Sequence, residues 1–387
     1  MDFALSEELQ MLKDMARDFA DEKIAPFADE WDENHYFPYE EVVKPMGELG
    51  FFGTVIPEEY GGNEMGWLAV TILTEEIARA SSSLRVQINM NTLGCAYTIF
   101  TYGSDELKQK YIPKLVSAEY IGGFGITEPN AGSDVMAMKS TAKDKGDHWL
   151  VNGYKTWISN ASIADLMIYY AYTDREARGK GLSAFVVELK NFNGITTTDL
   201  DKIGTRSCPT GEIILEDTKV PKENILGKPG DGAKIVFGSL NQTRLSAAAG
   251  GIGVAQACLD AATNYCKERE QFGKPISQFQ MNQDMIGQIT CELEAARLMV
   301  YKAAWQKDQG NIGNTLEVAM AKYLAGEIAV KASQVAMKIL GAYGYSTEYP
   351  VARYYRDAPA YQIVEGSTNI CKWITALDQL DIRKANR

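Results

Sequence analysis

The residue of this chain best placed for acid–base chemistry is Glu365, in the run YQIVEGSTN at residues 361–369. The apolar residues before it predict that its carboxylate is buried. Burying a carboxylate is costly unless it is paired or protonated, and such an environment is typical of a catalytic general base. The alternative is an acidic residue at the start of the helix expected from Thr368, where the helix dipole favours negative charge. This segment alone leaves both interpretations open.

A second candidate site is the loop predicted by the run FGITEPNAGSD at residues 124–134. Pro129 and Gly132 interrupt regular structure there, while Thr127 and Ser133 offer hydroxyl groups beside free backbone amides. Such a loop suits a phosphate or the polar edge of a ring. It is not the Gly-x-Gly-x-x-Gly fingerprint of a dinucleotide-binding fold. A simple turn is the alternative interpretation.

Two further residues are candidates for cofactor contacts. Trp157 stands near the end of an expected strand, where its indole could cover an aromatic ring, although a core tryptophan is the commoner explanation. Arg269 lies at the end of a helix that Gly273 and Pro275 terminate. It either binds a phosphate in bidentate fashion or only complements the negative helix terminus.

The elements that must position these residues fall into three regions. Residues 1–120 are expected to form an N-terminal α-helical domain, because apolar residues recur there every three or four positions. Residues 121–235 are expected to form a middle antiparallel β-barrel domain, with Asn152-Gly153 as a hairpin turn. Residues 236–387 return to long Ala-rich helices, as in a C-terminal four-helix bundle. The order of helices, strands and helices predicts a segregated α+β fold and not an alternating βαβ fold.

The composition excludes several function classes. The 387 residues carry a net charge of −12, which argues against nucleic acid as a partner. Only two histidines are present, and the six cysteines form no Cys-x-x-Cys pair, which argues against a metal site or a Ser-His hydrolase. The acidic N-terminus and the lack of a long apolar stretch predict a cytoplasmic protein without a membrane span.

Together these segments resemble the acyl-CoA dehydrogenase family. The motifs ITEP with AGSD (126–134), RxxFG (269–273) and YQxxEG (361–366) occur in the family's order and spacing, and the resemblance runs through essentially the whole chain. It implies the acyl-CoA dehydrogenase fold, with an N-terminal helical domain, a middle antiparallel β-barrel and a C-terminal four-helix bundle. It also implies that the chain binds FAD and oxidises an acyl-CoA thioester: a glutamate removes the α-proton while a β-hydrogen leaves as hydride to the flavin.

The resemblance assigns roles to individual residues. Glu365 takes the position of the catalytic base, with Arg244 near it, and residues 241–244 offer no acid where a minority of members place the base. Positions that line the flavin correspond to Phe124, Ile126, Thr127, Trp157 and Ser159, with Ser133 shared between the flavin phosphate and the ligand. Positions that meet the FAD of a neighbouring subunit correspond to Arg269, Gln271 and Phe272, and Asn369 stands at an adenine-side position. Such sharing implies a homo-oligomer, commonly a tetramer, and the family's usual acceptor is an electron-transferring flavoprotein.

Two residues bear on the acyl group. Arg85 is expected to face the acyl end of the pocket, and it matches an arginine that pairs with the distal carboxylate in glutaryl-CoA dehydrogenases; a structural or surface arginine is the alternative. Val364 stands where decarboxylating members usually carry tyrosine, and valine cannot donate a hydrogen bond. With Ser133, the neighbouring Asn89 and Gly366 complete the expected substrate-binding set.

The resulting hypothesis is oxidation of glutaryl-CoA to glutaconyl-CoA without decarboxylation. The first alternative is a dehydrogenase for a cyclic substrate, such as cyclohexane- or cyclohexene-carbonyl-CoA, or for a short-chain acyl-CoA. A remote alternative is a catalytically idle homologue that binds nucleic acid or assists assembly.

Overall fold

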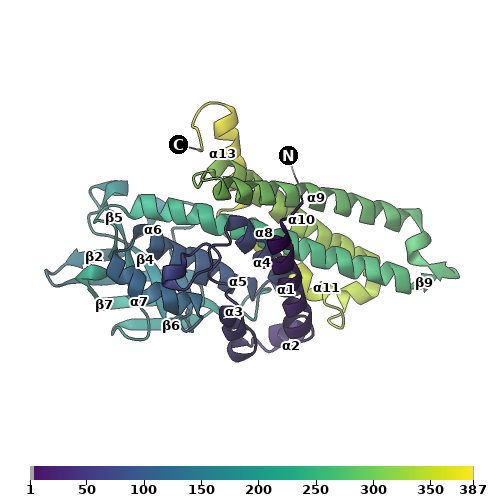
Figure 1. Cartoon of the computed structure of the whole chain (residues 1–387), viewed down its shortest axis with the longest axis horizontal. Coiled ribbons are helices and arrows are strands. Elements are labelled where there is room, and N and C mark those ends of the chain that lie inside the picture. Colours follow the sequence, from purple (N-terminus) through teal and green to yellow (C-terminus); the bar gives the residue numbers. More distant parts are fainter. Residues whose placement is uncertain (1–3, 387) are drawn as a thin grey trace.

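The computed structural model describes residues 4–386, and helices, strands and helices follow one another in the predicted order (Figure 1). The first region contains α1 (Glu7–Phe19), α2 (Ala28–Glu33), α3 (Lys44–Glu48), α4 (Trp67–Ala80), α5 (Arg85–Gln87), α6 (Tyr97–Tyr102) and α7 (Asp105–Val116), with the π-helical segments η1 (Ala20–Ile24), η2 (Tyr39–Val43) and η4 (Ile88–Ala96) between them. Because η4 continues α5 directly, Arg85 and Asn89 lie one turn apart on a single buried helical stretch.

The middle region forms one mixed sheet. Its strands are β1 (Gly122–Gly125), β2 (Thr141–Asp144), β3 (His148–Ser159), β4 (Leu166–Tyr172), β5 (Leu182–Glu188), β6 (Ile195–Asp199), β7 (Thr210–Pro221) and β8 (Ile225–Leu226). They pair in the order β6-β7-β3-β2-β4-β5-β8, and β1 pairs with β4. The predicted closed antiparallel barrel is not confirmed, because the pairings stop at β6 and β8, and both β1 and β2 run parallel to β4. Every residue of β4 and β5 is buried, as expected for strands covered on both faces.

The prediction of a hairpin at Asn152-Gly153 is wrong. β3 runs straight through both residues, with only a shift in its register against β7 between Val151 and Gly153. A Cβ atom on Gly153 would overlap the hydroxyl groups of Ser140 and Tyr169. The glycine is therefore needed because a buried polar cluster approaches the backbone here, and not because the chain turns.

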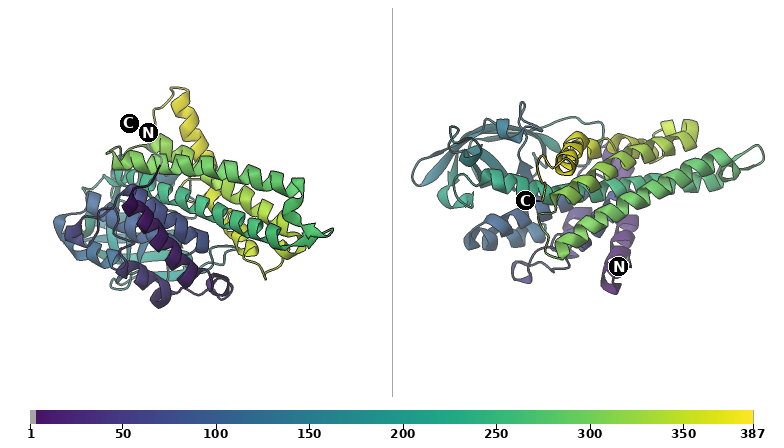
Figure 2. Two further views of the ribbon diagram at one scale, coloured as in Figure 1. Left: turned by 45° about the vertical axis from the view of Figure 1, so that its right-hand side comes forward. Right: turned by 90° about the horizontal axis from the view of Figure 1, so that it is seen from above.

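The last region consists of α8 (Gly232–Glu268), α9 (Gln280–Asp308), α10 (Thr315–Leu340), α11 (Val351–Asp357), α12 (Ala360–Ile363) and α13 (Thr368–Gln379), with the short pair β9 (Glu270–Gln271) and β10 (Lys274–Pro275) between α8 and α9. The three long helices α8, α9 and α10 pack along one another, and α4 of the first region packs against α8 and α9. Instead of completing the predicted four-helix bundle, α13 packs on α10 and projects from the molecule (Figures 1 and 2). By length and composition alone α8 could cross a membrane, but most of that stretch is buried in the fold, as in a core helix.

Short 3-10 turns connect these elements: η3 (Glu58–Tyr60), η5 (Val135–Ala137), η6 (Arg178–Gly181), η7 (Lys222–Asn224), η8 (Ile276–Gln278) and η9 (Gly341–Tyr345).

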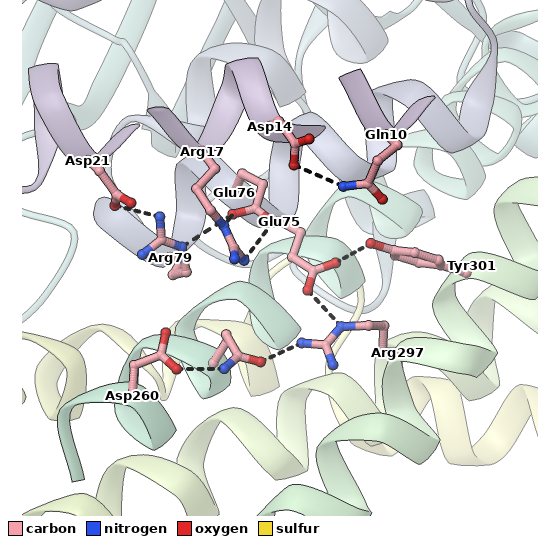
Figure 3. A network of polar contacts seen from close by, with 11 residues as sticks. Gln10, Asp14, Arg17, Asp21, Glu75, Glu76, Arg79, Asp260, Arg297 and Tyr301 are labelled. Atoms are coloured by element: carbon pink, nitrogen blue, oxygen red, sulfur yellow. Dashed lines mark hydrogen bonds and ion pairs between the residues drawn. The ribbon is translucent and has the colours of Figure 1, made fainter. Parts of the chain in front are cut away.

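Two adjacent buried carboxylates fix α4 between its neighbours (Figure 3). Glu76 accepts hydrogen bonds from Arg17 of α1, at 3.0 and 3.1 Å, and from Arg79. On the other side of α4, Glu75 accepts from Arg297 (2.8 Å) and Tyr301 (2.7 Å) of α9. Both carboxylates are paired and hydrogen-bonded, which offsets part of the cost of burying them. Since α4 leads directly into the stretch that carries Arg85, this network helps to hold that stretch in place.

Candidate active site

The carboxylate of Glu365 lies between two other elements of the fold. Its Oε1 accepts a hydrogen bond from Asn89 Nδ2 of η4 (3.0 Å), and its Oε2 accepts one from Thr243 Oγ1 of α8 (2.6 Å). The N-cap of α13 is instead Ser367, whose hydroxyl accepts from the backbone N–H of Ile370. Glu365 is therefore turned away from the helix start, and the helix-charge interpretation does not describe its side chain.

The backbone of the Glu365 loop is held in an unusual conformation. Glu365 and Gly366 both have positive φ, at 56° and 89°, and Arg244 Nε donates to the carbonyl oxygen of Glu365 at 2.8 Å. A Cβ atom on Gly366 would lie 3.1 Å from Arg244 Nη2, so a glycine fits both the conformation and the close approach. Burial lowers the pKa of Arg244, and the charges of Cys371 and Glu365 oppose that change. The predicted pair of Glu365 and Arg244 is thus in direct contact.

Arg85 is buried, with only 4% of its surface exposed. Its Nε donates to the hydroxyl of Tyr361 at 3.3 Å, and its guanidinium carbon lies 5.1 Å from the centre of the Tyr361 ring. That hydroxyl is 2.7 Å from Ser82 Oγ. Arg85 Nη1, however, is buried and has no hydrogen-bond partner among residues 4–386. A buried cationic donor without an acceptor is costly, so this nitrogen indicates a place for an anionic ligand group.

The loop at residues 124–134 is fastened to the end of β3. The backbone N–H of Thr156 donates to the carbonyl of Thr127 at 3.0 Å, and Lys155 Nζ donates to the carbonyl of Ile126 at 3.2 Å and to Glu128 Oε1 at 2.8 Å. Lys155 is fully buried, and burial lowers its pKa to about 8 against the attraction of the Glu128 carboxylate. These contacts hold the end of β3 and the predicted cofactor loop as one unit.

The residues predicted to line a flavin fit that cofactor. Trp157 has a positive φ of 59° and is 59% exposed, although Thr156 before it and Ile158 after it are buried. A register shift of β3 against β7 spans this position, and it frees the indole to cover a ring. Phe124 and Ile126 supply apolar surface, and the hydroxyls of Thr127 and Ser159 make no hydrogen bond within the described chain. An apolar wall with spare hydroxyls suits the isoalloxazine ring of FAD.

Three other predicted residues lie apart from this site. Arg269 is the C-cap of α8, and Gln271 and Phe272 belong to β9 and its turn to β10, at the end of the long helices opposite the sheet (Figure 1). Phe272 is 94% exposed there, so within one chain it does not help to form the site. Ser133 is exposed in its loop, and Asn369 is exposed in the first turn of α13.

Three residues that contact the predicted set were not singled out from the sequence. They are Thr243, Tyr361 and Ser82, which contact Glu365 or Arg85. Thr243 directly precedes Arg244, and Tyr361 is the first residue of the motif that contains Glu365. Both therefore adjoin residues that the sequence predicts for the site. Ser82 lies in a run of serines without a signal that separates it from its neighbours.

Three family models match the chain in order: Acyl-CoA dehydrogenase, N-terminal domain, at residues 6–119; middle domain, at residues 123–218; and C-terminal domain, at residues 230–377. Among curated relatives, the glutaryl-CoA dehydrogenase of Desulfococcus multivorans is 71% identical over 389 residues. The alignment covers 100% of this chain and 100% of that protein.

Solved structures agree with this match. A glutaryl-coenzyme A dehydrogenase in complex with glutaryl-CoA superposes with a TM-score of 0.99 at 71% identity, covering 100% of this chain and 98% of that chain. The butyryl-CoA dehydrogenase from Megasphaera elsdenii reaches a TM-score of 0.95 at 36% identity, covering 98% of this chain and 100% of that chain. The chain belongs to the acyl-CoA dehydrogenase family, as its motifs predict, and is an FAD-dependent oxidoreductase that acts on CH–CH bonds.

Proposed function

We propose that this chain oxidises glutaryl-CoA to glutaconyl-CoA and leaves the distal carboxylate in place. The observation that carries the proposal is the unpartnered Nη1 of buried Arg85. A substrate with a terminal carboxylate supplies the missing acceptor, whereas a linear or cyclic hydrocarbon acyl group leaves the cation without one. The similarity to a glutaryl-CoA dehydrogenase along the whole chain supports the same substrate.

The residues of the site suit removal of an α-proton. Glu365 is the base, and the hydrogen bonds from Asn89 and Thr243 to its two carboxylate oxygens hold the side chain in one orientation. Arg244 donates a hydrogen bond to the backbone carbonyl of Glu365, and this bond restrains the backbone from which the Glu365 side chain extends. FAD, when bound against Trp157 and the 124–134 loop, supplies the hydride acceptor for the β-hydrogen.

Val364 supports retention of the carboxylate. Loss of CO₂ leaves a carbanion that must be protonated, and a neighbouring hydroxyl would assist that step. Val364, which precedes the base, is partly exposed and offers neither a proton nor a hydrogen bond. The Arg85 guanidinium, in turn, stabilises the carboxylate in its charged form.

The same proposal includes assembly and an electron acceptor. The exposed β9–β10 turn with Phe272 and the projecting α13 with Trp373 leave large apolar side chains at the surface of one chain. Such surface suits contact with further copies, in which Arg269, Gln271 and Phe272 approach the FAD of a neighbour; we propose a homotetramer. Electrons then pass to an electron-transferring flavoprotein or a similar acceptor in the cytoplasm.

The deciding experiment mixes FAD-loaded enzyme with glutaryl-CoA and an artificial electron acceptor, and identifies the product by mass spectrometry. Glutaconyl-CoA is expected, and stoichiometric crotonyl-CoA would refute retention of the carboxylate. A parallel panel contains butyryl-, cyclohexanecarbonyl- and cyclohexenecarbonyl-CoA. Faster anaerobic flavin bleaching by one of these than by glutaryl-CoA would favour the alternative substrates.

The role of Arg85 is tested by Arg85→Gln in the same assay. The substitution removes the charge that pairs with the distal carboxylate but keeps a polar side chain. KM for glutaryl-CoA should rise by about 10- to 100-fold, while KM for butyryl-CoA, which has no distal carboxylate, should change by less than about threefold. An equal change for both substrates would identify Arg85 as a structural residue.

A further inference from the structure

A buried lysine on α10 contacts the loop that carries the base. Lys322 is 1% exposed, and its Nζ donates a hydrogen bond of 2.7 Å to the carbonyl oxygen of Gly366. No carboxylate in the described part of the chain forms a salt bridge with it within 4.0 Å. Removing an ammonium group from water is costly, so a lysine in this position needs a reason beyond packing.

The same face of α10 meets the other end of this loop. A Cβ atom on Gly326, one turn after Lys322, would lie 2.6 Å from the carbonyl oxygen of Tyr361. The backbone of α10 therefore lies directly against Tyr361, while Lys322 reaches Gly366. The helix therefore contacts both ends of the segment from Tyr361 to Gly366, and Glu365 lies between these two contacts.

Two buried cations thus hold two consecutive carbonyl groups, since Arg244 Nε donates to Glu365 O at 2.8 Å and Lys322 Nζ donates to Gly366 O. The left-handed conformation of a non-glycine residue such as Glu365 costs about 1–2 kcal/mol and persists only where surrounding contacts enforce it. We propose that Lys322 is a positioning residue for the reaction: with Arg244, it fixes the Glu365–Gly366 backbone and so aims the carboxylate of the base at the substrate α-carbon.

The charge of Lys322 makes this positioning sensitive to pH. Four groups act on its ammonium: Cys371 of α13, Arg244 of α8, Glu365 of the loop and Glu327 of α10. Burial is the largest influence and lowers the pKa of Lys322 to about 8. Above that pH the ammonium loses its proton and its hydrogen bond to Gly366 weakens, because a charged donor binds a carbonyl more strongly than a neutral one. The rate of proton abstraction should therefore fall as the pH rises through about 8.

The test uses FAD-loaded Lys322→Met, mixed anaerobically with glutaryl-CoA and with glutaryl-CoA deuterated at the α-carbon. A misaimed base should lower the limiting rate of flavin reduction by about 10- to 100-fold, while the substrate Kd changes by less than about threefold. The α-deuterium isotope effect should increase, because proton transfer becomes slower. The fall in rate near pH 8 should be absent from the variant.

The matched control is Lys307→Met. Lys307 is a second buried lysine, on α9, whose Nζ donates to the carbonyl of Ile312 and not to the base loop. It should retain the wild-type limiting rate within about twofold. A wild-type rate in Lys322→Met, an equal loss in both variants, or a loss confined to Kd would overturn the proposal.

A second variant covers the case in which Lys322→Met does not fold. Lys322→Gln keeps a neutral donor, so it should reduce flavin more slowly than wild type and without the change near pH 8; an unchanged pH profile would overturn the proposal. The inference rests on Glu365 as the base but not on the acyl group. The same rates measured with butyryl-CoA therefore still test Lys322 if glutaryl-CoA is not the substrate.

Discussion

The hydroxyl of Thr243 donates a 2.6 Å hydrogen bond to the carboxylate of Glu365, across 122 positions of sequence. Position 243 belongs to the segment in which a minority of family members carry the base. The contact shows that a side chain at position 243 points at the carboxylate of Glu365. We therefore expect a glutamate at position 243 to place its carboxylate in the same region.

Glu365→Gln should abolish proton abstraction, because an amide cannot accept the α-proton at neutral pH. The rate of anaerobic flavin reduction should fall by at least about 10²- to 10⁴-fold, with the flavin still bound. Combining Glu365→Gly with Thr243→Glu should restore a measurable part of the rate, because the new carboxylate reaches the same region. Thr243→Val is the control, since it removes only the donor and keeps the base. Flavin reduction at a wild-type rate in Glu365→Gln would show that another residue takes the proton.

Gly250 on α8 should determine how well the enzyme binds a distal carboxylate. A Cβ atom there would lie 2.7 Å from Tyr361 Cε1 and 3.0 Å from Arg85 Nε, so Gly250→Ala must displace the residues that fix the guanidinium. We expect kcat/KM for glutaryl-CoA to fall by about tenfold and kcat/KM for butyryl-CoA to fall much less. Overpacking should also cost about 1–3 kcal/mol of stability.

The matched control for Gly250 is Gly287→Ala on α9, where a Cβ atom meets nothing within 4 Å. It should leave both substrates unaffected and stabilise the helix by up to about 1 kcal/mol. If Gly250→Ala lowered kcat/KM equally for both substrates, the Tyr361–Arg85 contact would not govern specificity.

Sequence patterns predicted those features of the molecule that are determined by residues close together in the sequence. Periodicity located the helical and strand regions, and the three motifs located Glu365, the 124–134 loop and the turn with Phe272. The open mixed sheet was not predictable in this way, because the sheet order depends on which strands pair, and β1 and β2 both pair with β4 in parallel. Local turn chemistry was misleading at Gly153, where a buried cluster from other strands requires the glycine.

The parts of the site that escaped prediction are contacts across long sequence separations. Thr243 and Lys322 are ordinary helix residues and Ser82 lies in the turn after α4, and only the packing of these elements around one loop gives the three residues a role. Arg85 could be predicted as a candidate, but its unpartnered nitrogen is a property of the folded chain.

Val364→Tyr should change the product. A tyrosine hydroxyl next to the base in the chain offers a proton and a hydrogen bond that valine cannot, so part of the product should become crotonyl-CoA with release of CO₂. Val364→Phe is the control, because it adds the ring without the hydroxyl and should yield only glutaconyl-CoA. Both products are quantified by mass spectrometry after complete turnover. If the two variants form equal amounts of crotonyl-CoA, the size of the side chain governs decarboxylation and not its hydroxyl.

Lys307 should make the stability of this enzyme depend on pH. Its ammonium is buried, and burial lowers its pKa to about 7, with Arg244 acting in the same direction and Glu317 against it. In the unfolded chain the pKa of a lysine is about 10.4, so between about pH 7 and 10 the unfolded state binds more protons. The penalty for burying the charge is therefore complete below pH 7 and is relieved as the pH rises.

Lys307→Met removes this penalty and should raise the Tm of the FAD-loaded enzyme by roughly 2–5 °C at pH 6, with a smaller gain at pH 9. The carbonyl of Ile312 keeps a donor in the variant, because Asn241 Nδ2 also binds it at 3.2 Å, so no acceptor is left unpaired. Lys302→Met, an exposed lysine on the same helix, is the control and should shift Tm equally at both pH values. The contrary result is that Lys307→Met lowers Tm relative to wild type, and lowers it more at pH 6 than at pH 9. It would mean that the hydrogen bond and the Trp67 ring, 5.1 Å away, stabilise the ammonium more than burial penalises it.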